Sequence, residues 1–331
     1  MTQLSHPPRL LLIGSLTRDF IFYPDEPARL DLPGGRALAA AAGAVIWEKA
    51  LEIVAEIGQD YPSAHKDLLH KHGLSLNGLR VLDQPLEQRA VYSYDAEVRP
   101  GFPLVQACLR HGIPFPSALL GYQAEKDASL SLQGFSPFPL PPSFQMAAAA
   151  YLCAMPPENL REWIAYLYTH GVRRLVATFP KLQSTSPAHA QKLPLLEGLE
   201  ALLIHENDLR ILFWGKSDDL WEMAAQLSSI VPHIVIHLPS RRCLLYSAPS
   251  NERWEIPAYP ARGYPIGVEE AFGGGFLAGL LQTSSLLQAV LHGAISAAFK
   301  SESLDPFYCW DVLPELARSR LEYLALLAHP L

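Results

Sequence analysis

The hydrophobic positions of this chain fall into short continuous runs that alternate with segments of helical spacing. The first run, Arg9 to Ser15, is almost wholly apolar and ends in Gly-Ser, which is typical of a parallel strand buried on both faces. Asp19 to Tyr23 predicts a second extended segment. Gly34-Gly35 then leads into an alanine-rich segment, Arg36 to Glu48, for which we expect a helix packed closely against a sheet or a ligand.

The same alternation continues to the end of the chain and predicts an α/β fold. Further strands are expected at Leu51–Ile57, Arg89–Val98, Ala147–Cys153, Arg174–Thr178, Ala201–Ile204, His233–Leu238 and Cys243–Ser247. Further helices are expected at Ser63–His72, Pro157–His170 and Leu220–Ile230. Pro100 to Pro142 is rich in proline and glycine, which favours loops with short helices. Strands that alternate with helices predict a doubly wound parallel sheet, whose ligands lie beyond the carboxyl ends of the strands.

Composition narrows the class of protein and of partner. The chain has 331 residues and a formal net charge of -7, with no run of basic residues longer than two, which argues against a nucleic-acid or anionic-membrane partner. Its longest strongly apolar stretch, Ala37 to Trp47, is too short to span a bilayer, so we expect a cytoplasmic protein. The four cysteines lie far apart and predict neither a disulfide framework nor a zinc site.

The most informative segment runs from Tyr264 to Leu280 and reads YPIGVEEAFGGGFLAGL, a glycine-bearing turn followed by a helix of small residues. It resembles the second signature of the PfkB/ribokinase family of carbohydrate and nucleoside kinases, Asp-Thr-x-Gly-Ala-Gly-Asp-x-Phe-x-Gly-Gly-Phe. The residues that fit this pattern are Gly267, Ala271, Phe272, Gly274, Gly275 and Phe276. Tyr264, Glu269 and Glu270 depart from it, since they replace the first Asp, the second Gly and the catalytic Asp.

Three earlier segments extend the resemblance over nearly the whole chain. Ile13 to Asp19 resembles the first strand of the family, Pro33 to Arg36 the entry to its first signature, and Ile57 to Asp60 its Gly-x-Asp turn. The resemblance implies a single ribokinase-like domain over residues 1–331: a three-layer, doubly wound, mostly parallel sheet with a small β lid. The two lid segments would be about residues 19–32 and 89–98.

The resemblance also implies a reaction, ATP-dependent phosphoryl transfer, with magnesium, to a hydroxyl of a sugar or similar small molecule. Glu270 would be the base, and the backbone at Gly267, Val268 and Glu269 would form an anion hole. Asp19, Gly34, Gly35, Ala39 and Asp60 take the substrate-binding positions. Leu238, Arg241, His292 and Ser296 take nucleotide-binding positions, and Asp208 is the surviving acid of the magnesium motif.

Two departures lie in the turn itself. Glu270 is one methylene longer than aspartate, and a displacement of about 1 Å costs on the order of a hundredfold where reacting groups must be aligned. Glu269 puts a carboxylate beside the anion-hole donors, where it would compete with an incoming phosphate. Alternatively, both acids simply favour the helix macrodipole at its N-terminus. The residues leave these two interpretations open.

Further departures lie outside the turn. Ala39 stands in place of a sugar-binding Asn, and His205 in place of the Asn of the magnesium motif, although imidazole is a poor ligand for magnesium. Pro239 and Arg242 replace both glycines of the loop that lies against the nucleotide in the family. Arg241 and Arg242 are either phosphate ligands or solvated surface arginines.

Two functional hypotheses follow. The first is a PfkB-type carbohydrate kinase with weakened or altered activity, which would use ATP and magnesium. The second is a catalytically inactive protein that keeps the cleft to bind a metabolite or a nucleotide, or serves as an interaction module. The expected partner is a small hydroxylated molecule, and the lid segments would be the contact of a homodimer.

Overall fold

The computed structural model describes residues 9–123, 134–182, 184–261 and 263–331. In these ranges the larger sheet consists of β1 (Leu10–Ile13), β4 (Leu51–Gly58), β5 (Leu79–Leu82), β7 (Ala149–Leu152), β8 (Arg174–Thr178), β9 (Ala201–His205), β10 (His233–His237), β11 (Cys243–Ser247), β12 (Glu252–Ile256) and β13 (His329–Pro330). Its strand order is β13-β12-β11-β10-β9-β8-β7-β1-β4-β5. Neighbours from β5 to β10 pair in parallel, and β10 to β13 pair antiparallel. The predicted doubly wound, mostly parallel sheet is confirmed.

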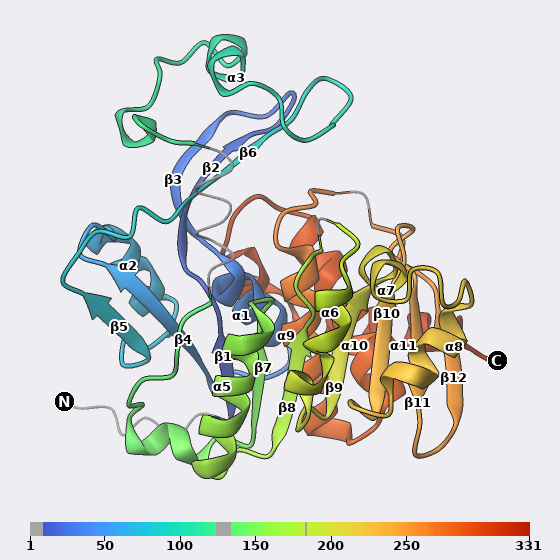
Figure 1. The fold of residues 1–331 in the computed structure, drawn as a ribbon. Helices are drawn as coiled ribbons and strands as arrows, with labels where there is room; N and C mark the ends of the chain where they lie inside the picture. Colours follow the sequence, from blue (N-terminus) through green and yellow to red (C-terminus); the bar gives the residue numbers. More distant parts are fainter. Residues whose placement is uncertain (1–8, 124–133, 183, 262) are drawn as a thin grey trace.

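Two helix layers cover the faces of this sheet, as Figure 1 shows. Strand β1 explains why: Leu10 and Leu12 enter one hydrophobic core, while Leu11 and Ile13 enter the other. The first core is shared with α1 (Arg36–Ala44), α2 (Ser63–Lys71), α9 (Val268–Thr283), α10 (Leu286–Ser301), η4 (Tyr308–Asp311) and α11 (Pro314–Ala325). The second is shared with η2 (Pro142–Met146), α5 (Pro157–Thr169), η3 (Leu193–Leu196), α7 (Glu206–Leu212) and α8 (Leu220–Leu227). The short helix α6 (Pro187–Gln191) lies beside α7.

A second, three-stranded sheet projects from the body. It has the order β3-β2-β6, with β2 (Thr17–Phe22), β3 (Arg29–Gly34) and β6 (Arg89–Ser93). The helical turns α3 (Leu104–Arg110) and η1 (Ser117–Leu119) pack against its outer part, as Figure 1 shows for α3. We call these three strands the small sheet; they overlap the two segments expected to form a lid, although β2 begins and β3 ends two residues outside the first of them.

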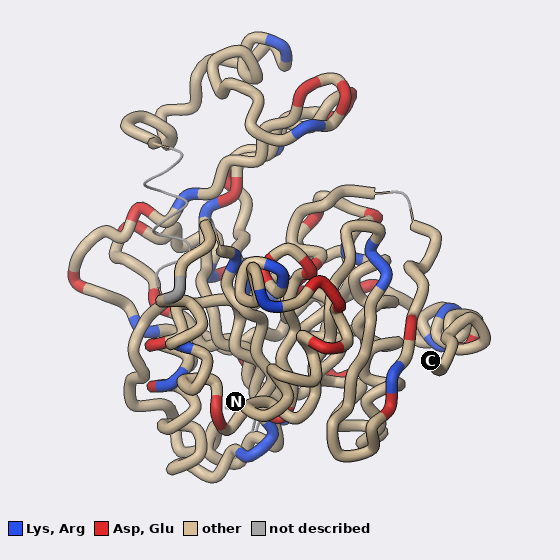
Figure 2. Tube along the Cα trace, turned by 45° about the vertical axis from the view of Figure 1, so that its right-hand side comes forward, with Lys and Arg blue, Asp and Glu red and all other residues tan. Residues whose placement is uncertain are grey.

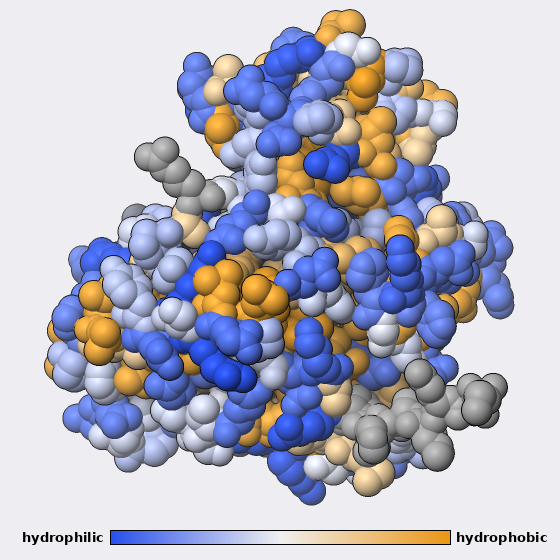
Figure 3. All heavy atoms as spheres, turned by 180° about the vertical axis from the view of Figure 1, so that it is seen from behind, coloured by the Kyte–Doolittle hydropathy of each residue, from blue (hydrophilic) through white to orange (hydrophobic). Residues whose placement is uncertain are grey.

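An apolar cluster joins the small sheet to the body. Ile21 and Tyr94 from the small-sheet side contact Ile266 and Leu304 from the body. Seen from behind in Figure 3, apolar side chains gather on the lower part of the projecting lobe, close to the body. Lysine and arginine are interspersed with aspartate and glutamate along the described chain in Figure 2.

Several elements differ from the sequence expectations. The alanine-rich helix ends at Ala44, and residues 45–47 continue as a turn. Strands β5 and β12 and helices α7 and α11 were not predicted, because short edge strands and helices flanked by loops carry little hydrophobic periodicity. The expected short helices after Pro100 are present as α3 and η1, while residues 124–133 lie outside the described ranges. Among the described helices, none combines the length and apolar character needed to cross a membrane.

Candidate functional site

The turn before α9 is built around Gly267. Its φ of 71° lies in the left-handed region, and a Cβ on it would come 2.8 Å from the Cβ of Ala39. Both observations require glycine at this position. The backbone N–H groups of the first helical turn have no acceptor within the helix, so they remain available to an anion. The residues expected to form the anion hole, Gly267, Val268 and Glu269, therefore lie at a helix N-terminus.

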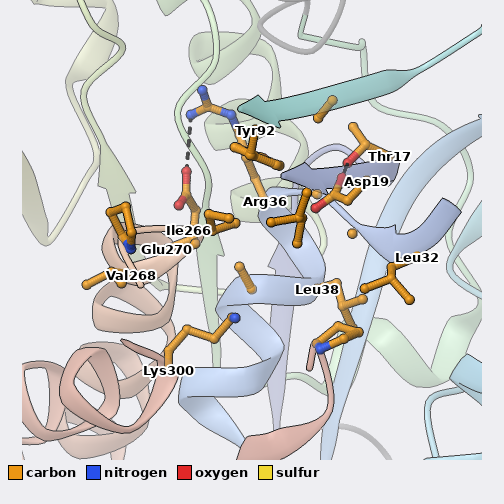
Figure 4. A pocket seen from close by; sticks show the side chains of 18 of the residues that line it. Thr17, Asp19, Leu32, Arg36, Leu38, Tyr92, Ile266, Val268, Glu270 and Lys300 are labelled. Carbon is orange, nitrogen blue, oxygen red and sulfur yellow. Dashed lines mark hydrogen bonds and ion pairs between the residues drawn. The ribbon is translucent and has the colours of Figure 1, made fainter. Parts of the chain in front are cut away.

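A cavity of about 250 Å³ lies between this turn, α1 and the small sheet. We call it the Asp19 cavity, and Figure 4 shows it from close by. Of the residues predicted from the sequence, Asp19, Gly34, Gly35, Ala39, Gly267, Val268, Glu269 and Glu270 line it. Most of the residues expected to bind a substrate and to act on it are thus brought to one cavity.

Asp19 forms one wall of this cavity and is almost fully buried, with 6% of its surface exposed. Its carboxylate accepts hydrogen bonds from the Thr17 hydroxyl and the Gly35 N–H. Burial raises its pKa to about 7, although both hydrogen bonds and the charge of Lys300 act in the opposite direction. A carboxylate has about four acceptor positions, so two remain for the hydroxyl groups of a ligand. A Cβ on Gly34 would lie 2.0 Å from this carboxylate, which explains the glycine there.

Glu270 faces the same cavity from the start of α9. Its Oε1 lies 3.4 Å from Nη1 of Arg36, the first residue of α1, and Figure 4 marks this ion pair with a dashed line. Both side chains are mostly buried. The pair fixes the Glu270 carboxylate at the mouth of the anion-hole turn, on the far side of the cavity from Asp19.

Glu269 is held by two basic side chains. Its Oε1 lies 3.1 Å from Nζ of Lys181 and its Oε2 lies 2.9 Å from Nε2 of His205. Burial alone would raise the pKa of this carboxyl, but His205 and Lys181 together hold it well below its ordinary value. Glu269 is therefore a charged group at the N-terminus of α9 whose carboxylate is already paired.

A second cavity, of about 270 Å³, lies on the other side of this ion pair. We call it the His237 cavity. It is lined mainly by apolar residues, among them Leu238, Phe272 and the three alanines of α10, Ala294, Ala297 and Ala298. Glu269 lines both cavities, as do Pro265 and Val268. The Glu269 side chain thus lies where the two cavities adjoin.

Of the expected nucleotide-binding residues, Leu238 and Arg241 line the His237 cavity. Arg241 has a φ of 61°, so this arginine does adopt the left-handed conformation that a glycine would favour. Arg242, by contrast, lies 2.5 Å from Glu255 in an ion pair on the neighbouring strand. The two consecutive arginines therefore have different surroundings.

His292 and Ser296 are not among the residues that line this cavity. The His292 ring packs on Trp47 with ring centroids 4.4 Å apart, and its Nδ1 lies 2.6 Å from the Gln288 carbonyl. Ser296 donates to the Gly43 carbonyl and accepts from the indole N–H of Trp47. In the structure both side chains join α10 to the segment that begins with α1.

Asp60 is likewise not among the residues that line the Asp19 cavity. Its two carboxylate oxygens accept the backbone N–H groups of Leu86 and Glu87, at 2.9 and 3.0 Å. The carboxylate therefore fixes the chain that leads into β6.

The side chains around Asp208 do not form a suitable magnesium site in the conformation that the structure shows. Its Oδ1 accepts the Leu182 N–H at 2.7 Å, and burial raises its pKa. The charged neighbours that act on it include Lys181 and His205, whereas magnesium prefers carboxylate, water and phosphate oxygens. In the described ranges no group of three or more His, Cys, Asp or Glu side chains is arranged to hold a metal ion.

The phosphates of a nucleotide do not fit either while Glu269 keeps this position. The N–H groups that would receive them lie beside a carboxylate, and like charges repel strongly at this range. The two basic side chains that would attract phosphate, Lys181 and His205, already pair with that carboxylate.

Three basic residues of the site were not predicted from the sequence: Arg36, Lys181 and Lys300. Arg36 could have been found, because it follows the Gly-Gly entry directly. Lys181 follows the carboxyl end of β8, the edge of the sheet where ligands are expected. Lys300 lies in the last turn of α10, and no local pattern in the sequence distinguishes it from a solvated helix end.

The sequence shows a weak similarity to a known kinase. No protein-family model matches the sequence. A cytidine kinase from Thermococcus kodakarensis is 23% identical over 289 residues, which cover 86% of this chain and 92% of that protein.

Solved structures resemble the chain over almost its full length. A ribokinase from Arabidopsis thaliana, complexed with ribose and ATP, matches with a TM-score of 0.68 and 16% identity, covering 95% of this chain and 99% of that one. A putative ribokinase II from E. coli in its apo form matches with a TM-score of 0.67 and 15% identity, covering 96% and 99%. A nucleoside kinase of the ribokinase family from Methanocaldococcus jannaschii matches with a TM-score of 0.66 and 16% identity, covering 95% and 98%. The chain therefore has the ribokinase-like fold that these kinases share.

Proposed function

We propose that this chain is a divergent member of the PfkB/ribokinase family that binds a small hydroxylated molecule in the Asp19 cavity. Its inherited reaction is phosphoryl transfer from ATP to a hydroxyl of that molecule, and we propose that this transfer is weakened here. The ribokinase-like fold and the similarity to a cytidine kinase support the inherited reaction.

One observation carries the proposal. Asp19 and Glu270 face one cavity from opposite sides, and each carboxylate is held by a neighbour, Thr17 and Arg36 respectively. Asp19 would accept one ligand hydroxyl and so orient the molecule. A second hydroxyl would then lie toward Glu270, the candidate base, at the N-terminus of α9.

Glu269 supports the weakened transfer. Its carboxylate lies where a donor phosphate would approach the helix N-terminus, and its ion pairs with Lys181 and His205 must break before those cations can bind phosphate. The magnesium motif retains one carboxylate, Asp208, whose Oδ1 already accepts a backbone N–H. Both features act on the side of the cleft where ATP, the phosphate donor, would bind, which we call the donor side. They leave the Asp19 cavity intact.

The second candidate function is binding without transfer. The same Glu269 ion pairs favour it, because they close the donor side while the Asp19 cavity stays open. Partner contacts of the small sheet, including a homodimer, belong to this candidate.

The two candidates differ in what they require of ATP. Isothermal titration of the full chain with ATP, with and without magnesium, is paired with transfer of labelled phosphate to a panel of sugars and nucleosides. Slow transfer, with weak ATP binding, is the outcome expected for the divergent kinase. Failure to bind ATP at millimolar concentration, together with no transfer, would overturn the kinase proposal and leave the binding protein.

A further inference from the structure

Lys300 is a buried cation in the wall of the Asp19 cavity. It lies in the last turn of α10, and only 6% of its surface is exposed. Its stem runs beside the anion-hole turn, since its Cε lies 3.5 Å from the position that a Cβ on Gly267 would take. Figure 4 shows its amino group pointing toward the open middle of the cavity, on the side opposite the pair Arg36 and Glu270.

The hydrogen-bonding capacity of this ammonium group is mostly unused. An ammonium group has three N–H donors. Within the described part of the chain, the one hydrogen bond recorded for it is to the Ser303 carbonyl, at 3.5 Å, the long limit for such a bond. No carboxylate of the described residues lies within 4 Å of it, and the charges of Cys309, Asp19 and Asp305 act on it from farther away.

The other cations of the cavity provide the contrast. Arg36 pairs with Glu270, and Lys181 pairs with Glu269. Lys300 is more deeply buried than either, yet it has no acidic partner among the described residues. A charge taken out of water without a partner carries a large desolvation cost, which a bound anion would offset.

From this geometry we infer that Lys300 recognises a negatively charged group on the ligand of the Asp19 cavity. The ligand is then an acidic hydroxylated molecule: one end offers a hydroxyl to Asp19, and another end offers a carboxylate or a phosphate to Lys300. The inference rests on the proposed function, because it takes the Asp19 cavity as the site of the hydroxylated molecule.

The size of the cavity and its remaining wall agree with such a ligand. At about 250 Å³ it is at or below the lower end of typical ligand sites, so it suits a molecule of about one sugar ring. Leu38, Ile266 and Leu304 line it as well, so the acidic group would be partly shielded from water. Ion pairs are stronger where water is excluded, and a neutral ligand would leave the ammonium group without a partner.

The test compares three probes that share one carbon skeleton: glucose, gluconate and glucose 6-phosphate. Each is titrated into the full chain by calorimetry without nucleotide, so the result does not depend on the donor side. We expect gluconate, glucose 6-phosphate or both to bind at least about tenfold more tightly than glucose. The probe that gains shows whether the acidic group is a carboxylate or a phosphate. Equal affinity for all three probes, or no binding of any of them, overturns the inference.

Variants locate the effect. Lys300→Met keeps the length of the side chain and removes its charge, and we expect it to abolish the preference for the acidic probe while glucose affinity stays within about twofold. Lys192→Met, which removes a surface lysine paired with Glu158, is the matched control and should keep the preference. An unchanged preference in Lys300→Met contradicts the inference.

A different result identifies failure of the proposed site. If Asp19→Asn leaves the affinity for every probe unchanged, the hydroxylated molecule does not bind in this cavity, and the proposed function fails together with the inference. If Asp19→Asn weakens all probes but glucose binds as tightly as its acidic counterparts, only the inference about Lys300 fails.

Discussion

The Asp19 cavity and the His237 cavity are neighbours of similar volume, about 250 and 270 Å³, but their polar groups are arranged in opposite ways. In the Asp19 cavity a buried carboxylate and a buried ammonium group face open space. Where the Asp19 cavity adjoins the His237 cavity the polar groups face each other instead, because Glu269, which lines both cavities, pairs with Lys181 and His205. The Asp19 cavity thus directs a carboxylate and an ammonium group at its open space, whereas Glu269, the carboxylate that the two cavities share, is paired with side chains of the protein itself.

This difference shows which residues carry the proposed weakening of phosphoryl transfer. Helices α1 and α9, which lie beside the cavities, pack closely through glycines: a Cβ on Gly43 or Gly274 would lie less than 2 Å from backbone of the facing helix. The scaffold is therefore intact on both sides. Under the proposed function, the weakening comes from a few side chains at the start of α9, at the end of β9 and in the loop beyond β10.

The largest effect should come from removing the carboxylate that separates the anion-hole turn from an incoming ATP, on the donor side of the cleft. In the double variant Glu269→Gly and Glu270→Asp, the anion-hole donors lose their competing carboxylate and the candidate base regains its shorter side chain. We expect phosphate transfer from ATP to rise about a hundredfold, the range associated with one anion-hole donor or a displacement of about 1 Å. Labelled-phosphate transfer measures it. Glu269→Gln keeps the size but not the charge, and should give a smaller gain.

An unchanged transfer rate in the double variant would locate the defect elsewhere. Ala39, His205 and Pro239 would then be sufficient causes, and the contrast between the two cavities would not rest on Glu269.

The next largest effect concerns ligand binding in the Asp19 cavity. Asp19→Ala removes the carboxylate that a ligand hydroxyl would reach, and a hydrogen bond to a charged group contributes about 1.5–3 kcal/mol. We expect ligand affinity to fall between about tenfold and a hundredfold. Titration calorimetry of the tightest probe measures it. Asp25→Ala, an aspartate outside the cavity lining, is the control and should bind normally. Equal losses in both variants would contradict a specific role for Asp19.

Asp19 should also make stability depend on pH. Its folded-state pKa is raised to about 7, so the stabilising proton is fully bound below the unfolded value of 3.8 and is lost as the pH rises through about 7. The free energy of unfolding should therefore fall by about 2 kcal/mol between pH 5 and pH 7, relative to that of Asp19→Asn, because one proton is released over this window. Denaturant unfolding of both proteins at each pH measures it. Parallel stability curves would show that the carboxyl titrates near its ordinary pKa.

The smallest effects should come from the arginines beside the His237 cavity. Arg242 pairs with Glu255 at a partly exposed position, and such pairs contribute about 0–1 kcal/mol. Arg242→Ala should therefore leave ATP affinity unchanged, whereas Arg241→Ala, in the cavity lining, should weaken it by a few fold. Nucleotide titration of the two variants measures the difference. Unchanged ATP affinity in both variants would show that neither arginine contacts the nucleotide, and an equal loss in both would contradict the distinction between them.

The sequence predicted the fold because its strong signals are local. The buried strand at Leu10 needs apolar residues on both faces, and the turn at Gly267 needs a positive φ, and both requirements are visible in the residue types. The weaker signals were missed for the same reason. The edge strand β12 and the helix α11 face solvent on one side and carry mixed residues.

The site was only partly visible in the sequence, because charge pairing is a property of three dimensions. The pattern placed Glu269 beside the anion hole but left open whether it filled the site or only favoured the helix dipole. Of its partners, Lys181 follows strand β8 and His205 ends strand β9, so no spacing in the sequence could reveal them. Lys300 is separated from Asp19 by most of the chain, and only the folded structure brings both into one cavity.

The measurement that tests the contrast most directly is the affinity of the full chain for ATP with magnesium, compared with that of the single variant Glu269→Gly. If Glu269 closes the donor side, calorimetry should give weak binding for the natural sequence and binding at least about tenfold tighter for the variant, while ligand affinity at the Asp19 cavity stays the same. Equal ATP affinities of the two proteins would contradict the conclusion that this carboxylate occupies the donor site.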